Sequence, residues 1–171
     1  MLNVILIGMP GSGKSTVGVL LAKALLMDFV DTDLLLQKRY NKTLIKLIES
    51  LGIEGFKRIE NETLKSLKFE NTVVATGGSA VYGDEAMKNL KTDGVVVYLK
   101  LTPEEIKNRI KNITTRGIVM NPGCTINELY LERASLYEKY ADVIVECNGK
   151  TVEETVEAVV SALDDFKEKN L

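Results

Sequence analysis

The sequence of 171 residues contains no histidine. Catalysis by an imidazole base and metal sites built on histidine are therefore excluded. Cysteine is scarce as well: Cys124 and Cys147 are the two present, and they show no pairing pattern. Sparse cysteine is typical of a protein in a reducing compartment, so we expect a cytoplasmic protein whose thiols are buried or incidental.

Long apolar runs and long basic runs are also lacking. No apolar run approaches the roughly 20 residues that a membrane helix needs, and the N-terminal residues are too strand-like for a signal peptide. The formal net charge is −2, from 22 basic and 24 acidic residues, and the basic residues do not run together. We therefore expect neither a membrane nor a nucleic acid as a partner.

Strand and helix signals alternate along the whole chain, without a linker or a repeat. Three Thr-x-x-Glu segments, which begin at Thr102, Thr125 and Thr151, have capping-box spacing and predict helix starts. Apolar spacing predicts a further helix over residues 15–27. Short apolar runs predict buried strands of a parallel sheet at 3–7, 29–31, 72–75, 95–99 and 143–145. The expected fold is one α/β domain over residues 1–171, a three-layer α/β/α arrangement with helices on both faces of the sheet.

Residues 8–15, Gly-Met-Pro-Gly-Ser-Gly-Lys-Ser, form a complete phosphate-binding P-loop between the first strand and the first helix. Its glycines let backbone N–H groups point at phosphate oxygens, and the helix N-terminus adds partial positive charge. Lys14 can reach the β- and γ-phosphates, and the Ser15 hydroxyl can bind Mg²⁺. The alternative is a glycine-rich turn without a ligand. The residues expected to contact ATP here are Gly11, Ser12, Gly13, Lys14, Ser15 and Thr16.

Two carboxylates, Asp31 and Asp33, follow the second predicted strand. The carboxyl end of a strand beside the P-loop strand faces the crevice where ligands bind in open α/β sheets. Side chains alternate along an extended segment, so both aspartates are expected on the same side. One could hold Mg²⁺, and the other could position an acceptor hydroxyl or receive its proton. The alternative is that one of them caps the following helix.

Residues 112–124 fit neither a helix nor a strand. The segment is polar and contains Gly117, Pro122 and Gly123 between two capped helices. A loop of this length in a compact domain is usually a functional lid or disordered. Arg116, in its middle, could neutralise charge on a transferring phosphoryl group. The alternative is a solvated surface loop with an incidental arginine.

Taken together, these segments resemble the shikimate kinase family, P-loop kinases of the nucleoside-monophosphate-kinase type, over residues 2 to about 163. The residues that carry the resemblance are Gly8–Ser15, Phe29–Asp33, Gly55–Glu60, Ala75–Gly78, Arg109, Arg116, Glu132–Arg133, Leu136–Tyr137 and Tyr140–Asp142. The resemblance implies five parallel strands, with the second at one edge and the P-loop strand in the middle. It further implies a monomeric kinase that uses ATP and Mg²⁺ to phosphorylate the 3-hydroxyl of shikimate, in aromatic amino acid biosynthesis.

The resemblance also assigns roles to single residues. On the nucleotide side, Asp31 and Ser15 help to position Mg²⁺, Arg109 lies against adenine, and Arg116 belongs to the lid. The implied catalytic residues are Lys14, Asp33 and Arg116. The acceptor side is implied to span about residues 33–61 and to use Asp33, Lys57, Glu60, Gly77, Gly78, Ser79 and Arg133, the last of which binds the acceptor carboxylate.

Several of these residues have plainer interpretations. Arg109 lies four residues after Glu105, and Glu60 lies three residues after Lys57, so each could form an ordinary ion pair on a helix surface. Glu60 could equally be one half of an acceptor site. Arg133 could also form a surface ion pair, although an arginine fork suits a carboxylate.

The chain departs from the family pattern at Lys57, where the family has arginine, and at Ser79, where it has a third consecutive glycine. Gly117 replaces a proline after the lid arginine and is expected to loosen the loop. Two other functions therefore remain open: a kinase of the same build for another small hydroxylated acid or polyol, and a nucleotide-binding regulatory module without transfer activity. The paired aspartates and Arg133 argue against the module, which needs neither.

Overall fold

The computed structural model describes residues 2–110 and 117–170, so Arg116 and the first part of the predicted lid lie outside the described residues. The described strands form one parallel sheet in the order β2-β3-β1-β4-β5. They are β1 (Asn3–Ile7), β2 (Asp28–Asp31), β3 (Thr72–Ala75), β4 (Gly94–Lys100) and β5 (Val143–Glu146). Each strand agrees with its predicted run to within one residue at either end. The expected topology, with β2 at an edge and β1 central, is confirmed.

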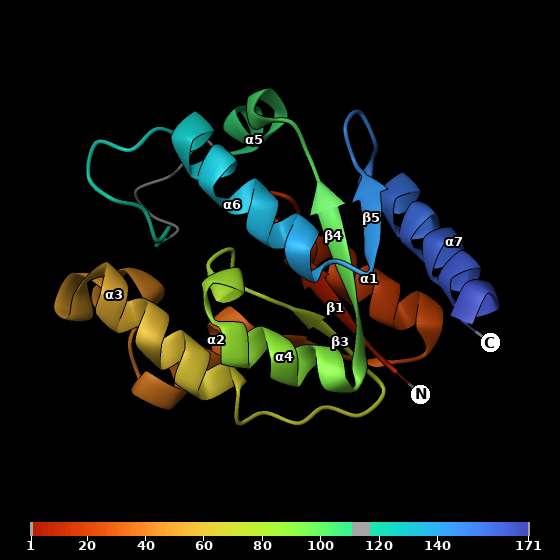
Figure 1. The fold of residues 1–171 in the computed structure, drawn as a ribbon, viewed down its shortest axis with the longest axis horizontal. Coiled ribbons are helices and arrows are strands. Elements are labelled where there is room, and N and C mark those ends of the chain that lie inside the picture. Colours follow the sequence, from red (N-terminus) through yellow and green to blue (C-terminus); the bar gives the residue numbers. More distant parts are fainter. Residues whose placement is uncertain (1, 111–116, 171) are drawn as a thin grey trace.

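Helices cover both faces of this sheet (Figure 1). α1 and α7 contact each other and pack on one face, whereas α4 and α6 contact β4 from the other face. α2 and α3 stand together beyond the edge of the sheet, on the side of β2 and β3. The helices are α1 (Lys14–Leu25), α2 (Thr32–Tyr40), α3 (Leu44–Leu64), α4 (Asp84–Thr92), α5 (Pro103–Arg109), α6 (Ile126–Tyr140) and α7 (Val152–Asn170), with a 3-10 turn η1 (Ala80–Tyr82) before α4.

Threonine caps begin three of these helices, as the spacing predicts. At Thr125 and Thr151 the capping box is complete, because each hydroxyl accepts from the N–H of the glutamate three residues later and that carboxylate accepts from the threonine N–H. At Thr102 the hydroxyl accepts from Glu105 N, while the Glu105 carboxylate is drawn to Arg109.

A second, smaller apolar cluster lies apart from the main core, between α2, α3 and the segment that follows the undescribed residues. It consists of Leu36, Leu47, Phe56 and Val119. α3 bends inside this region, because Gly52 has φ 71° and ψ 176° and interrupts the helix. The region predicted to bind the acceptor therefore has an apolar support of its own.

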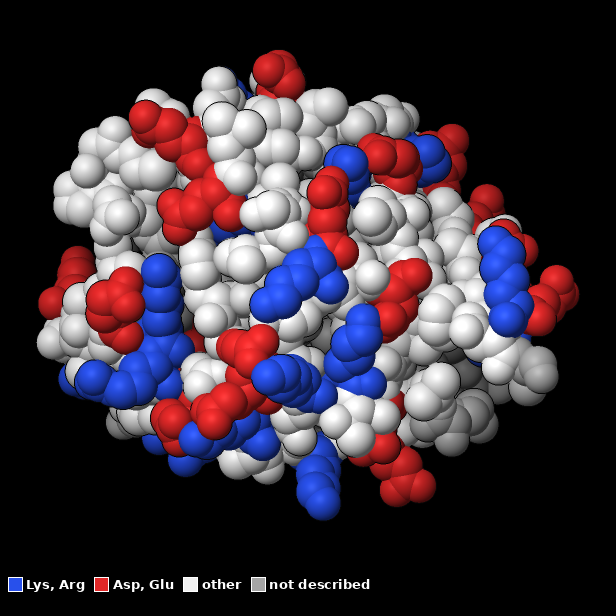
Figure 2. Space-filling model, in the orientation of Figure 1, with Lys and Arg blue, Asp and Glu red and all other residues white. Residues whose placement is uncertain are grey.

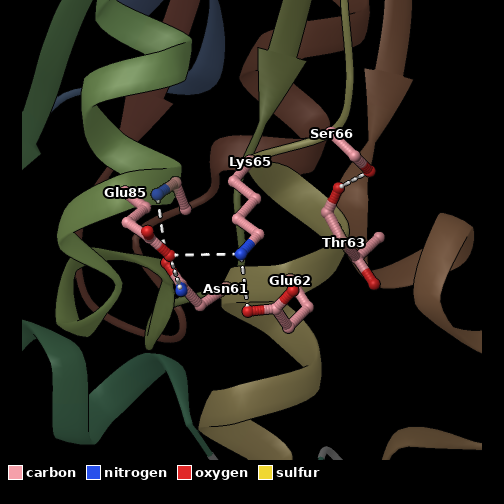
Figure 3. Close-up of polar contacts among 7 residues, drawn as sticks. Asn61, Glu62, Thr63, Lys65, Ser66 and Glu85 are labelled. Atoms are coloured by element: carbon pink, nitrogen blue, oxygen red, sulfur yellow. Dashed lines mark hydrogen bonds and ion pairs between the residues drawn. The ribbon is translucent and has the colours of Figure 1, made fainter.

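The second half of α3 is fastened to the start of α4 (Figure 3). Asn61 Oδ1 accepts from Ala86 N at 3.0 Å, and Asn61 Nδ2 donates to Glu85 Oε2 at 3.1 Å. Because α4 follows Gly83, which has no side chain to cap it, Asn61 supplies the cap from α3. Lys65 joins Glu62 and Glu85 across the same contact at 2.7 and 3.3 Å. This contact holds the end of α3 against the start of α4.

Acidic and basic side chains are interspersed over the face shown in Figure 2, in keeping with the small net charge. In residues 2–110 and 117–170, no helix combines the length and the apolar character needed to cross a membrane.

Candidate active site

A cleft of about 340 Å³ opens at the carboxyl ends of β1 and β3. The P-loop and the start of α1 form one side of it, and α2, the segment after β3, α6 and residues 117–119 form the other. This cleft brings together most of the predicted site residues, namely Gly11, Gly13, Lys14, Ser15, Thr16, Asp33, Gly77, Gly78, Ser79, Arg109 and Arg133. Predicted nucleotide and acceptor residues therefore share one space.

The P-loop has the geometry of an anion site. Gly13 caps α1 with φ 88°, a left-handed conformation that other residues rarely adopt, and the first N–H groups of α1 face the cleft. Lys14 is buried, and its ammonium donates to Gly8 O at 2.8 Å, Met9 O at 2.9 Å and Ser12 Oγ at 3.3 Å. The helix dipole and this ammonium together favour a polyphosphate here.

Two oxygens suited to Mg²⁺ meet beside the P-loop. The Ser15 hydroxyl donates to Asp31 Oδ2 at 2.6 Å, and Asp31 Oδ1 accepts from Asp33 N at 2.9 Å, so Asp31 also caps α2. The described residues contain no group of three acidic, cysteine or histidine side chains able to hold a metal by themselves. Mg²⁺ in phosphoryl-transfer sites commonly uses one or two protein oxygens, substrate phosphates and water, so this oxygen pair fits it.

Asp33 lies in the first turn of α2, not on an extended segment, because α2 begins at Thr32. The expectation that strand alternation aligns the two aspartates is therefore wrong, although the helix cap still brings them together. Burial, followed by the charge of Asp31, raises the pKa of Asp33 to about 6, against the opposing effect of Lys14. A Cβ at Gly77 would lie 2.6 Å from Asp33 Oδ1, so this carboxyl occupies space that only glycine leaves open.

Glu60 lies just behind this glycine. It is 2% exposed, and both of its carboxyl oxygens contact Ser79 Oγ, at 2.8 and 2.9 Å. Burial raises the pKa of Glu60 to about 8, while the hydrogen bond from Ser79 acts in the opposite direction. Glu60 is therefore not a solvated partner of Lys57, and the hydroxyl of Ser79 points at a carboxyl group instead of the cleft.

Lys57 itself is turned toward two other groups. Its ammonium lies 3.5 Å from Glu54 Oε1 and 3.9 Å from the centre of the Tyr82 ring. Lys57 does not line the cleft formed by the described residues, but it shares the Tyr82 ring with Arg133, whose guanidinium carbon lies 5.2 Å from the ring centre. Sequence reasoning missed Tyr82, and no local pattern marks it.

Arg133 is the largest fully buried side chain among the described residues, at 1% exposure. Nε donates to the Tyr82 hydroxyl at 3.2 Å, and Nη2 donates to Val119 O. Within the described part of the chain no carboxylate lies within ion-pair distance of it. The interpretation as a surface ion pair is therefore wrong. A buried charge is costly unless it is paired, which favours an anionic ligand in the cleft.

Arg109 forms the predicted ion pair and also borders the cleft. Its Nε pairs with Glu105 Oε1 at 3.0 Å along α5, and the side chain also lines the cleft. A Cβ at Gly13 would lie 3.9 Å from Arg109 Nη1, which places the guanidinium beside the P-loop. The ion pair can therefore hold the guanidinium in position for a nucleotide.

Within the predicted lid, the described residues resume at Gly117, which is closely packed. It has φ 63°, and a Cβ there would lie 2.9 Å from Ile45 N at the start of α3. The expected looseness is therefore not found at Gly117 itself, because the missing side chain permits a close contact. The predicted role of Arg116 lies outside the described residues.

Comparison with known proteins assigns this chain to one family. The chain matches the shikimate kinase family over residues 10–164. It is 40% identical to a shikimate kinase of Thermodesulfovibrio yellowstonii over 163 residues, 94% of each chain. It is 39% identical to one of Clostridium botulinum over 155 residues, 90% of this chain and 92% of the other. A solved structure, shikimate kinase of Acinetobacter baumannii in complex with shikimate, is similar with TM-score 0.86 and 28% identity, over 96% of this chain and 94% of that one.

Proposed function

This chain belongs to the shikimate kinase family, and we propose that it transfers the γ-phosphoryl group of ATP to the 3-hydroxyl of shikimate. The observation that carries this proposal is the position of Arg133. Its buried guanidinium lacks a carboxylate partner among the described residues and lines the same cleft as the P-loop. One cleft thus offers a cationic site for an acceptor carboxylate opposite a site for a triphosphate.

On the acceptor side, Arg133 binds the carboxylate of shikimate through its planar fork, which can make two parallel hydrogen bonds. The Tyr82 hydroxyl, bound to Nε, keeps the fork oriented. Asp33 binds the hydroxyl that receives the phosphoryl group, and Gly77 and Gly78, which line the cleft, leave room for the side chains of Asp33 and Arg133. Asp33 and Arg133 thereby fix the acceptor at both ends.

In the transfer step, the acceptor oxygen forms a bond to the γ-phosphorus while the bond from that phosphorus to its bridging oxygen breaks, and ADP leaves. Asp33 orients the hydroxyl and is placed to receive its proton, and burial makes its carboxylate more basic than an exposed aspartate. Lys14 and the N-terminal turn of α1 stabilise the negative charge on the phosphates. Catalysis then consists mainly of positioning and electrostatics.

For the nucleotide, we propose that Ser15 and Asp31 would hold Mg²⁺, which would neutralise negative charge on the phosphates. Arg109 lies against the adenine, and Arg116 acts from the lid, as the family pattern implies. We further propose that the protein works as a monomer, as the family resemblance implies, because one chain by itself supplies both the P-loop and Arg133 to the cleft. Light scattering after gel filtration, with and without ATP, tests that state.

A coupled assay of ADP release tests the function, with shikimate, quinate and small polyols as acceptors. We expect shikimate to be the preferred acceptor, and Arg133→Lys to raise the KM for shikimate by at least tenfold because an ammonium cannot replace the fork. The same variant should change the KM for shikimate methyl ester, which has no carboxylate, far less. Arg39→Lys, an exposed arginine on α2, is the matched control and should behave as wild type. Faster phosphorylation of an uncharged polyol than of shikimate would refute the assignment.

A further inference from the structure

The Ser79 hydroxyl is the hydrogen-bond partner of both carboxyl oxygens of Glu60. Ser79 Oγ lies 2.8 Å from one carboxyl oxygen of Glu60 and 2.9 Å from the other. A hydroxyl has one hydrogen, which it can share between both oxygens of a carboxylate, or donate to one oxygen of a carboxylic acid whose own proton is donated back to it. Only the second arrangement gives each short contact a hydrogen of its own. The contact therefore accommodates a carboxylic acid, and the surroundings of Glu60 decide its charge.

The charged groups around Glu60 do not supply an ion pair in the described part of the chain. Lys57, on the same helix, pairs with Glu54 instead. Arg133, on α6, lowers the pKa of Glu60 from a distance, but it donates to neutral oxygens. Asp33 of α2 repels a negative charge on Glu60, and the Tyr137 hydroxyl of α6 donates to Gly78 O.

The carboxyl group of Glu60 is also held in place by its neighbours. Asn61, the next residue, caps α4 and binds Glu85, which fastens this turn of α3 (Figure 3). A Cβ at Gly77 would lie 3.4 Å from Glu60 Oε2 and 2.6 Å from Asp33 Oδ1, so two carboxyl groups converge on one glycine. Two ionised carboxylates in such a position would repel each other and any anion bound nearby.

We propose that burial beside Asp33 makes Glu60 a neutral carboxylic acid, in hydrogen-bond contact with Ser79, and that this keeps Arg133 available for an anionic acceptor. Ionised Glu60 competes for the guanidinium and repels the acceptor carboxylate, so it weakens binding without touching the phosphates. Glu60 is then a positioning residue that sets the charge of the acceptor site. The effect of Glu60 on acceptor binding rests on the proposed function, whereas the protonation of Glu60 does not depend on it.

The protonation is tested without turnover, by ¹³C NMR of protein labelled at the glutamate carboxyl carbons. We expect one carboxyl resonance to titrate at about pH 8, the raised pKa of Glu60, and to be missing in Glu60→Gln. In Ser79→Ala it should titrate at still higher pH, because the lost hydroxyl stabilises the ionised form. Titration of Glu60 near the ordinary glutamate value, about 4.3, would overturn the proposal.

The effect on the acceptor is tested by the pH dependence of the KM for shikimate. If only the neutral form of Glu60 binds the acceptor, a pKa of about 8 makes KM rise roughly tenfold between pH 7 and pH 9, with a smaller change in kcat. Glu60→Gln should abolish the rise, and the exposed Glu62→Gln on the same helix should keep it. A rise that persists in Glu60→Gln, or its absence in the wild type, refutes the role of Glu60. Failure to phosphorylate shikimate at any pH refutes the proposed function instead, and the NMR titration then still decides the protonation.

Discussion

Substitution of Gly77 by alanine should slow phosphoryl transfer about a hundredfold while hardly affecting the stability of the protein. Gly77 has no positive φ, so alanine fits the backbone, but its Cβ would lie 2.6 Å from Asp33 Oδ1. Ordinary contact begins near 3.4 Å, so the carboxyl group must retreat by about 0.8 Å, which a side-chain rotation allows. A misplacement of about 1 Å in a positioning group costs on the order of a hundredfold in rate, equivalent to about 2.7 kcal/mol.

The assay for Gly77→Ala combines thermal unfolding with initial rates of ADP release. We expect Tm to stay within a few degrees of wild type and kcat/KM for shikimate to fall about a hundredfold. Gly83→Ala is the matched comparison, because its Cβ would lie 2.5 Å from Asn61 Oδ1, at the α4 cap and away from the cleft. That variant should lose stability and keep most of its kcat. Near wild-type kcat/KM in Gly77→Ala would refute the argument that Asp33 depends on this space.

Three further variants separate the donor site, the acceptor site and the fold. Lys14→Ala should abolish transfer and weaken ATP binding, measured by calorimetry, and full turnover would contradict the P-loop assignment. Lys57→Arg should lower the KM for shikimate if residue 57 reaches the carboxylate, whereas an unchanged KM would agree with its position over Tyr82 and place it outside the acceptor site. Thr125→Ala removes the complete capping box of α6 and should lower the free energy of unfolding by about 1 kcal/mol without changing kcat, and an unchanged Tm would show that the box contributes nothing.

Much of the fold could be predicted because its signals are local. The P-loop and the helix starts at Thr125 and Thr151 depend on residues within a few positions of one another, and each forms as predicted. The strands of the sheet were recognisable because both of their faces are buried, which produces short continuous apolar runs. The predicted phosphate-binding residues followed from the P-loop motif itself.

The acceptor side could not be predicted in this way, because its contacts join residues far apart in the sequence. The helical spacing suggested that Glu60 pairs with Lys57, yet its partner is Ser79, 19 residues away. Arg133 is held by Tyr82, 51 residues away, and by the carbonyl of Val119. Spacing along the sequence suggests candidate partners for a side chain. It does not show which of these side chains are buried in the folded protein.

The sequence by itself determined the element order, the phosphate-binding loop and the set of groups available for chemistry, since hydrophobic periodicity and short-range hydrogen bonds act between neighbours in the chain. Tertiary structure decided the charge state and the partner of each group in the cleft. The packing of α3 and α6 around the turn after β3 buries Glu60 and Arg133 without joining them in an ion pair. Desolvation depends on everything that surrounds a group, and that environment exists only in the folded chain.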